Sequence, residues 1–216
     1  SSPYNSSAFT DEPTVEVLNA PGMDASSVGN HEFDRGQDEL YRVSGTTDGT
    51  YSDDVTACPD TLGGEPFEVG VDGCFEDSTG NPFAGTDFPY LAANVVDDAT
   101  GEPVLPPYQI LEFPGSDGGT NRVGLIGVVT ADTPNIVSPA GIEGLTFGDE
   151  ATAISTYTQE LQAQGVEAIG VLIHEGGSGA GAGINNCANG LAGTPIAAIN
   201  DSINAGAGAA VDLIIS

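Results

Sequence analysis

The seven residues Val123-Gly-Leu-Ile-Gly-Val-Val129 carry no charged or hydrogen-bonding side chain. A strand with one solvated face alternates apolar and polar residues, whereas a strand covered on both faces is almost wholly apolar. We therefore expect residues 122–130 to form a strand with packed layers on both sides. Apolar runs bounded by Gly, Pro, Asn or Asp predict further strands at 91–96, 109–113, 168–174 and 211–216.

Helices are expected at 13–20, 148–164 and 194–205. In the second, apolar residues and Thr158 recur at helical spacing: Ala151, Ile154, Tyr157, Thr158 and Leu161. Asp149 stands where an N-cap belongs, and Gly165 stands just past the end of the pattern. Because strands and helices alternate from about residue 90 onward, the sequence predicts an α/β layered fold.

The stretch from about residue 37 to 88 is rich in turn residues and is predicted to be an insertion or lid. Cys58 and Cys74 flank a loop of Gly, Asp and Pro within it. We favour a Cys58–Cys74 disulfide, which implies an oxidising compartment. A metal site is the weaker alternative, because the sequence offers no Cys-x-x-Cys pair or neighbouring histidine.

Charge excludes several classes of partner and chemistry. The chain has 32 acidic residues against three arginines and no lysine, which gives a formal net charge of −29. Such a surface repels phosphate backbones, so nucleic acid and anionic membranes are not expected as partners. The sequence also lacks the run of about 18 apolar residues that a membrane span needs. Without lysine, neither a P-loop nor Schiff-base catalysis is possible.

The block Gly29-Asn30-His31-Glu32-Phe33-Asp34 is the sharpest chemical motif. Asn30 offers a neutral carbonyl oxygen that suits a divalent cation. His31 could hydrogen-bond a phosphoryl oxygen or protonate a leaving alkoxide, and Asp34 could hold the imidazole in one tautomer. The alternative is a turn at a strand end with a capping Asn and an incidental histidine.

His174 ends a predicted apolar strand and precedes a glycine turn. A histidine at the carboxyl end of a strand is well placed to bind a metal. Taken alone, it fits an ordinary hydrogen-bonded histidine better. His31 and His174 are the chain's two histidines, and both stand at predicted strand ends beside Gly and Glu. Together the two motifs favour a metal site.

The six-residue block resembles a motif of the metallophosphoesterase superfamily, with the residue sequence typical of 5′-nucleotidases. Residues 88–95, 123–130 and 211–216, together with the opening segment, are similar to further stretches of that family. The resemblance implies an α/β fold of two packed mixed β-sheets flanked by helices, a four-layer αββα arrangement that is incomplete here. Residues 1–216 would form part of a catalytic domain with an insertion at about 37–88.

The resemblance also implies roles for individual residues. Asn30 and His174 would bind one of two divalent metal ions, which could be Zn, Mn, Fe or a similar metal. His31 would act on the leaving group in an in-line displacement, supported by Asp34. Cys187 would pair with a cysteine beyond the chain or remain a free thiol.

Three of the family's metal-binding motifs are missing: Asp-x-His, the bridging Asp of Gly-Asp, and Gly-His-x-His. The remaining acidic residues stand in turn-like contexts. We therefore expect a fragment that is metal-poor and inactive by itself.

The function expected of the parent protein is release of phosphate from nucleoside 5′-monophosphates or related nucleotides. A C-terminal nucleotide-binding domain of the same parent chain would hold the base, as in 5′-nucleotidases. The alternatives are a phosphodiesterase acting on cyclic nucleotides or diesters, and a non-catalytic acidic extracellular binding module. The expected location is secreted, periplasmic or cell-surface.

Overall fold

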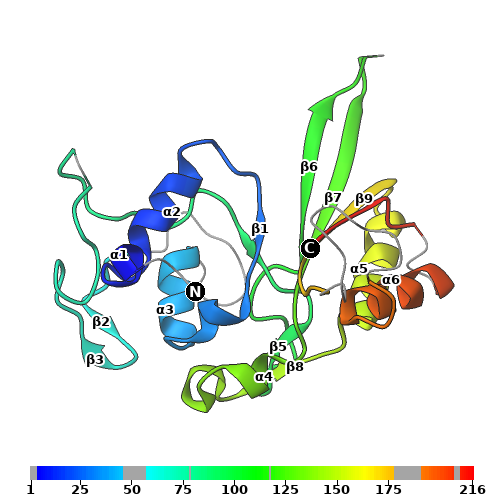
Figure 1. Ribbon diagram of the computed structural model, residues 1–216. Helices are drawn as coiled ribbons and strands as arrows, with labels where there is room; N and C mark the ends of the chain where they lie inside the picture. Colours follow the sequence, from blue (N-terminus) through cyan, green and yellow to red (C-terminus); the bar gives the residue numbers. More distant parts are fainter. Residues whose placement is uncertain (1–3, 46–56, 78, 117, 178–190, 207–209) are drawn as a thin grey trace.

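The computed structural model describes residues 4–45, 57–77, 79–116, 118–177, 191–206 and 210–216. Its largest sheet has four strands in the order β10-β9-β7-β6 (Figure 1). β6 (Tyr108–Pro114) is antiparallel to β7 (Thr120–Val129), whereas β7, β9 (Ala168–His174) and β10 (Leu213–Ile215) are parallel. The β6–β7 hairpin extends beyond the rest of the molecule (Figure 1).

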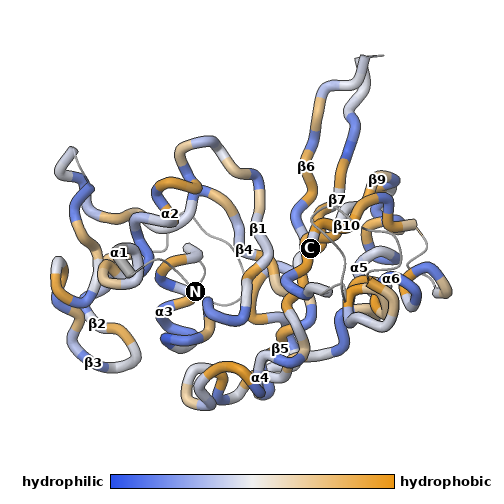
Figure 2. The backbone as a smooth tube through the Cα atoms, in the orientation of Figure 1, coloured by the Kyte–Doolittle hydropathy of each residue, from blue (hydrophilic) through white to orange (hydrophobic). Residues whose placement is uncertain are grey.

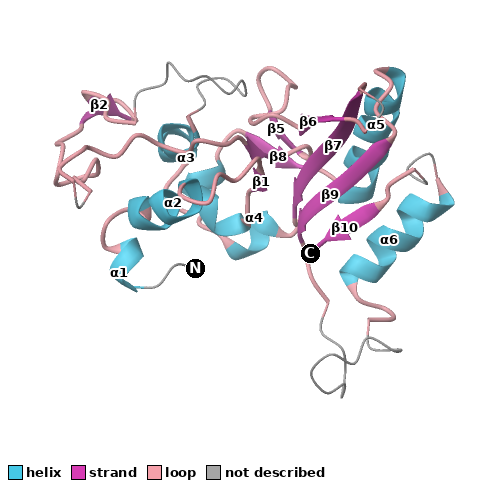
Figure 3. Cartoon of the chain, turned by 90° about the horizontal axis from the view of Figure 1, so that it is seen from above, coloured by secondary structure: helices cyan, strands magenta, loops and turns pink. Residues whose placement is uncertain are grey.

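The prediction that β7 is covered on both faces is confirmed. Helices α5 (Glu150–Ala163) and α6 (Pro195–Ala205) lie on one side of the sheet (Figures 1 and 3). β7 also contacts the parallel pair of β1 (Ser26–Ser27) and β4 (Tyr90–Leu91). Its buried side chains contribute to the apolar cores of both layers.

The two glycines of β7 allow these layers to approach closely. A Cβ atom added at Gly124 would lie 2.7 Å from Leu161 Cδ1 of α5, and one added at Gly127 would lie 2.3 Å from Leu91 Cβ of β4. Positions 124 and 127 are an odd number of residues apart, so they face opposite sides of the sheet. Any larger residue at either position would push a packing layer away.

The second layer consists of short strand pairs. β5 (Val95–Asp97) is antiparallel to β8 (Leu145–Phe147), and β1 pairs with β4. The single strand predicted at 91–96 is therefore wrong, because it is interrupted between Leu91 and Val95. The cause is the buried Asn94, whose side chain bonds the backbone N–H and C=O of Val129 and the C=O of Gly148.

The helix predictions are confirmed within one or two residues. The Asp149 carboxylate caps α5 by accepting a hydrogen bond from the Thr152 N–H at 2.7 Å. Gly165 follows with φ 77°, the left-handed conformation typical of a helix end. α2 covers Glu12–Asn19, and the strand predicted at 211–216 is limited to β10.

The N-terminal part carries elements that the sequence did not indicate. They are α1 (Tyr4–Ser7), α3 (Gln37–Ser44) and the hairpin of β2 (Thr61–Leu62) and β3 (Glu65–Pro66). The stretch predicted as a turn-rich insertion thus begins with a helix. The 3-10 helix η1 (Asn30–Phe33) precedes this stretch, and α4 (Thr133–Ile136) and the 3-10 helix η2 (Pro139–Ile142) follow it.

Apolar residues concentrate in the strands of the large sheet and in the segments packed against it (Figure 2). Within the described ranges, every helix falls short of the length and apolar character needed to cross a bilayer.

Candidate active site

The Gly29–Asp34 block forms η1, directly after β1. Gly29 stands at its start, where an added Cβ would lie 2.8 Å from Glu32 Oε2 and 3.2 Å from His174 Cε1, so a larger residue would displace the Glu32 carboxylate. Glu32 turns back to accept a hydrogen bond from the Gly29 N–H at 2.6 Å. The block is therefore wound tightly against the end of β9, which brings His174 to it.

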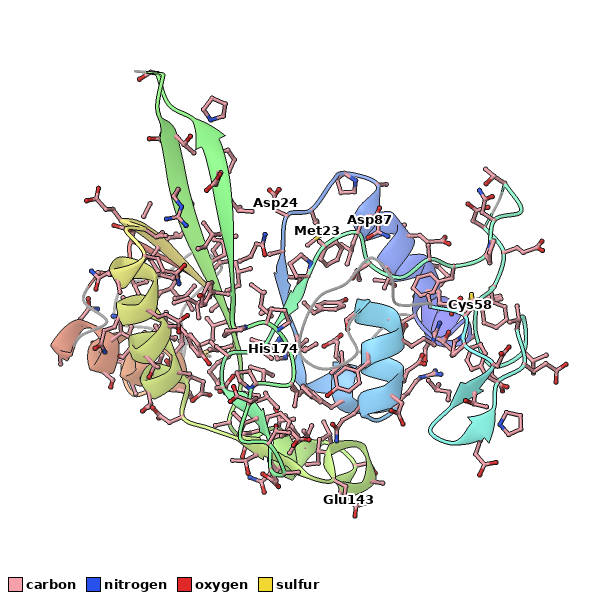
Figure 4. The ribbon with its side chains drawn as sticks, turned by 180° about the vertical axis from the view of Figure 1, so that it is seen from behind. Met23, Asp24, Cys58, Asp87, Glu143 and His174 are labelled. Carbon is pink, nitrogen blue, oxygen red and sulfur yellow. A yellow bond between two sulfur atoms is a disulfide. The ribbon has the colours of Figure 1, made fainter. Side chains whose placement is uncertain are left out.

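Asn30 and His174 meet, although 144 positions separate them in the sequence. Asn30 Oδ1 lies 2.9 Å from His174 Nε2, and Asn30 is only 7% exposed. His174 is placed by the parallel register of β9, in which it pairs with Val129 at the end of β7. Figure 4 shows His174 between the large sheet and the N-terminal helices.

His31 and Asp34 form a second pair, with 2.7 Å between His31 Nδ1 and Asp34 Oδ2. Their side chains are 45% and 47% exposed. The carboxylate next to Nδ1 fixes the orientation of the ring and favours the proton on that nitrogen. This leaves His31 Nε2 as the ring nitrogen that can address a ligand.

The Asn30–His174 pair and the His31–Asp34 pair line two different cavities at the surface. Asn30 and His174 line a cavity of about 570 Å³ that Asp132 and Glu175 also border. His31 and Asp34 line a cavity of about 280 Å³ between η1, α2 and α3. The adjacent side chains of Asn30 and His31 thus line different cavities.

The donor set fits part of a metal site. Asn30 Oδ1 and His174 Nε2 are an amide oxygen and an imidazole nitrogen, both suited to borderline divalent cations, and they converge within 2.9 Å. Among the described residues, no group of three or more His, Cys, Asp or Glu side chains is arranged to hold a metal ion. The two side chains can thus contribute to a ligand set without completing it.

The expectation that the other acidic residues stand in turns is wrong for a cluster beside the smaller cavity. Glu12 and Glu39 are buried in the first turns of α2 and α3 and both bind Arg42. Arg42 Cζ also lies 5.5 Å and 5.4 Å from the ring centroids of Phe67 and Phe83. Because arginine is rare in this acidic chain, a buried ion-pairing role for one of the arginines could have been suspected from the sequence.

The predicted Cys58–Cys74 disulfide is present, on the side of the N-terminal helices away from the sheet (Figure 4). Its Cys74 N–H donates to Glu12 Oε1 at 2.6 Å, which ties the loop to α2. Cys187 lies outside the described residues, so its pairing stays a prediction.

Several relatives found by comparison with known proteins are named nucleotidases or phosphodiesterases. No protein-family model matches the chain. It is 38% identical over 169 residues to an endonuclease, YhcR, of Bacillus subtilis, an alignment that covers 78% of this chain and 11% of the relative. It is 34% identical over 177 residues to the cell wall protein Lmo0130 of Listeria monocytogenes, covering 80% and 19% respectively. More distant relatives are named 5′-nucleotidases and 2′,3′-cyclic-nucleotide 2′-phosphodiesterase/3′-nucleotidases.

Among solved structures, the calcineurin-like phosphoesterase YfkN of Bacillus subtilis matches with a TM-score of 0.57 and 23% identity. The match covers 99% of this chain and 51% of that one, and it shows a shared fold. The chain spans less than a fifth of the length of YhcR and of Lmo0130.

Proposed function

Because the chain belongs to the metallophosphoesterase superfamily, with 5′-nucleotidases among its relatives, we propose that it contributes to the active site of a metal-dependent nucleotide phosphohydrolase. The observation that carries the proposal is the convergence of Asn30 and His174 at 2.9 Å beside the His31–Asp34 pair. An amide oxygen and an imidazole that can bind a cation, and a second imidazole held by a carboxylate, are the kinds of group that metal-assisted transfer of a phosphoryl group uses.

In this proposal Asn30 and His174 hold one of two divalent ions, and the remaining ligands come from the longer protein. When bound, such ions supply Lewis-acid polarisation of the phosphoryl oxygens. His31 Nε2 donates a proton to the leaving oxygen, while Asp34 holds the proton on Nδ1 and stabilises the charged ring. A water-derived hydroxide attacks phosphorus in line while the bond from phosphorus to the leaving oxygen breaks, so phosphate and an alcohol are released and no covalent intermediate with this chain forms.

The primary substrate class is nucleoside monophosphates. Cyclic or diester substrates are the second candidate, because two relatives at 29% and 31% identity carry both phosphodiesterase and 3′-nucleotidase in their names. A further C-terminal domain of the longer protein would bind the nucleotide base. The disulfide and the cell wall relative support a secreted, periplasmic or cell-surface location. The stretch at about 37–88 would be an insertion in this catalytic domain.

The test is phosphate release from 5′-AMP and from 2′,3′-cyclic AMP with added Mn²⁺ or Zn²⁺. The proteins compared are the longer protein, its His31→Ala and Asp34→Asn variants, and the 216-residue chain. We expect His31→Ala to lower kcat by about 10²–10⁴-fold, since general acid catalysis contributes that much. Asp34→Asn should lower it by about 10–100-fold, the usual effect of losing a carboxylate that orients a histidine.

The matched control is Asp77→Asn, a carboxylate in an exposed turn that should leave turnover unchanged. The 216-residue chain should release no phosphate, because its described residues lack a complete ligand set. Absence of turnover by the longer protein with either metal and either substrate would favour the non-catalytic binding module. Turnover of the cyclic ester alone would favour the phosphodiesterase.

A further inference from the structure

Asn94 is a buried polar residue that lines neither cavity of the candidate site, yet its side chain is fully engaged as a donor. Asn94 Nδ2 donates to the Val129 C=O at 2.7 Å and to the Gly148 C=O at 3.0 Å. Asn94 Oδ1 accepts from the Val129 N–H at 3.0 Å. One side chain therefore bonds both backbone groups of Val129, and both N–H donors of its amide are used.

Asn94 takes the place of a neighbouring strand along the end of β7. The β6–β7 ladder ends at Ile126 of β7. Beyond that point the Ala93 N–H donates to the Gly127 C=O at 2.7 Å, and Asn94 bonds Val129. Val129 is 0% exposed, so its N–H and C=O would be costly to leave without a partner. Asn94 thus holds β7 in place up to its last residue.

The end of β7 in turn supports the backbone of His174. Val129 and His174 are the last register pair of the parallel β7–β9 ladder. The next residue, Thr130, donates from its N–H to the His174 C=O at 3.0 Å. The ends of a ladder open more easily than its centre, because they have neighbours on one side only. The bonds from Asn94 to Val129 therefore steady the strand end that carries the His174 imidazole.

The segment that contains Asn94 is also bonded to the strand that leads to Asn30. The Leu91 C=O accepts from the Val28 N–H at 3.1 Å, and Asn30 follows Val28 after a single intervening glycine. The segment 91–94 is thus bonded both to β1, which precedes Asn30, and to β7, which is paired with His174. The distance between Asn30 and His174 depends on how this segment is held.

We propose that Asn94 is a positioning residue for the candidate metal site: by bonding Val129, it keeps His174 Nε2 within reach of the ion that Asn30 Oδ1 also binds. The inference rests on the proposed function, in which Asn30 and His174 share one divalent ion. Metal affinity depends on how well the ligands are oriented before the ion binds. A buried amide outside the site then sets part of the affinity of the site.

The experiment measures Mn²⁺ binding to the longer protein from the EPR signal of unbound Mn²⁺, with no substrate present. Asn94→Leu keeps the approximate volume of the side chain and removes its hydrogen bonds to Val129 and Gly148. It should raise the Kd for one of the bound Mn²⁺ ions by about 10–100-fold, the usual effect of losing a group that orients a metal ligand. Asn94→Ser keeps a hydroxyl that can bond one backbone group, so it should raise the Kd by a smaller factor.

The matched control is Leu161→Ala, which destabilises the fold at a fully buried position of α5 and should leave the Kd unchanged. As long as most chains stay folded, a loss of stability by itself does not change the Kd. Circular dichroism checks the folded fraction of each variant. Phosphate release gives a second readout: Asn94→Leu should need more Mn²⁺ for its half-maximal rate, while its kcat at saturating Mn²⁺ should approach the native value.

An unchanged Kd in folded Asn94→Leu would overturn the inference, and so would an equal rise in Asn94→Ser and Leu161→Ala. If Asn94→Leu does not fold, the comparison of Asn94→Ser with Leu161→Ala decides.

The outcome is separate from that of the phosphate-release test on the native protein. Turnover by the native protein with an unchanged Kd in the Asn94 variants would overturn the positioning role alone. Weaker Mn²⁺ binding in those variants without native turnover would support the positioning role and overturn the proposed hydrolysis. A native protein that binds no Mn²⁺ would overturn both.

Discussion

The sheet half and the N-terminal half of the molecule meet at η1 and are stabilised by different kinds of interaction. The large sheet with α5 and α6 packs around aliphatic side chains, among them Ile126, Ile154 and Leu161, all 0% exposed. The N-terminal half also buries charge, in Glu12, Glu39 and Arg42, and adds a disulfide. One half supplies His174, and the other supplies Asn30, His31 and Asp34.

The difference shows how a strongly acidic chain can hold a site together. The sheet half gains stability from apolar area removed from water. In the N-terminal half, Arg42 binds two carboxylates, the Ala57 carbonyl and two aromatic rings, so a single side chain joins α2, α3 and the disulfide loop. Burial alone lowers the pKa of Arg42, but bonding to Glu39 and Glu12 raises it overall.

The largest effect is expected from breaking the buried charges. Arg42→Met leaves Glu12 and Glu39 unpaired and should lower the free energy of unfolding by about 3–5 kcal/mol, as for other buried pairs that lose one partner. Urea denaturation measures it. The control is Arg122→Met, whose partner Glu112 is 63% exposed and whose loss should cost about 1 kcal/mol or less. Similar losses for both variants would contradict the central role of Arg42.

A cavity in the sheet half should have a somewhat smaller effect. Leu161→Ala removes a side chain that is 0% exposed and packs against the Gly124 face of β7, at a cost of about 3 kcal/mol. The same denaturation measures this loss. Leu213→Ala is the matched control, because Leu213 is 56% exposed, and it should change stability by less than about 0.5 kcal/mol. A larger loss from Leu213→Ala would show that β10 is more buried than described.

The smallest effect concerns an exposed charge of the N-terminal half. The Thr79 hydroxyl and the backbone N–H groups of Asn81 and Thr79 donate to Asp77 and lower the pKa of its carboxyl below 3.8. Because the folded state favours the ionised form, this contribution to stability is present above the ordinary pKa. It is lost as the pH falls through the lowered one.

An NMR titration of the Asp77 carboxyl should give a midpoint below 3.8. Asp97→Asn, a change in a different turn, should leave that midpoint unchanged. A midpoint at or above the ordinary value would show that the 77–81 turn does not hold the carboxylate in solution. The electrostatic difference between the N-terminal half and the sheet half would then depend on the buried charges of Glu12, Glu39 and Arg42 alone.

The sequence by itself determined the elements whose pattern is local. The apolar run of β7, the cap and glycine of α5, and the end of β9 at His174 could all be predicted, since period and capping depend on neighbouring residues. The six-residue block likewise singled out Asn30, His31 and Asp34, whose roles in a site stay a prediction. The break at Asn94 and the helix α3 could not be predicted, because a distant strand satisfies Asn94 and a distant carboxylate satisfies Arg42.

Only the tertiary structure decided which side chains meet. It brought Asn30 to His174 through the register of β9 on β7, and it placed Asn30 and His31 at different cavities. It also turned Glu12 and Glu39, which look like ordinary surface acids, into the partners of a buried arginine. Local patterns fix the elements, but contacts between residues far apart in sequence depend on how the layers pack.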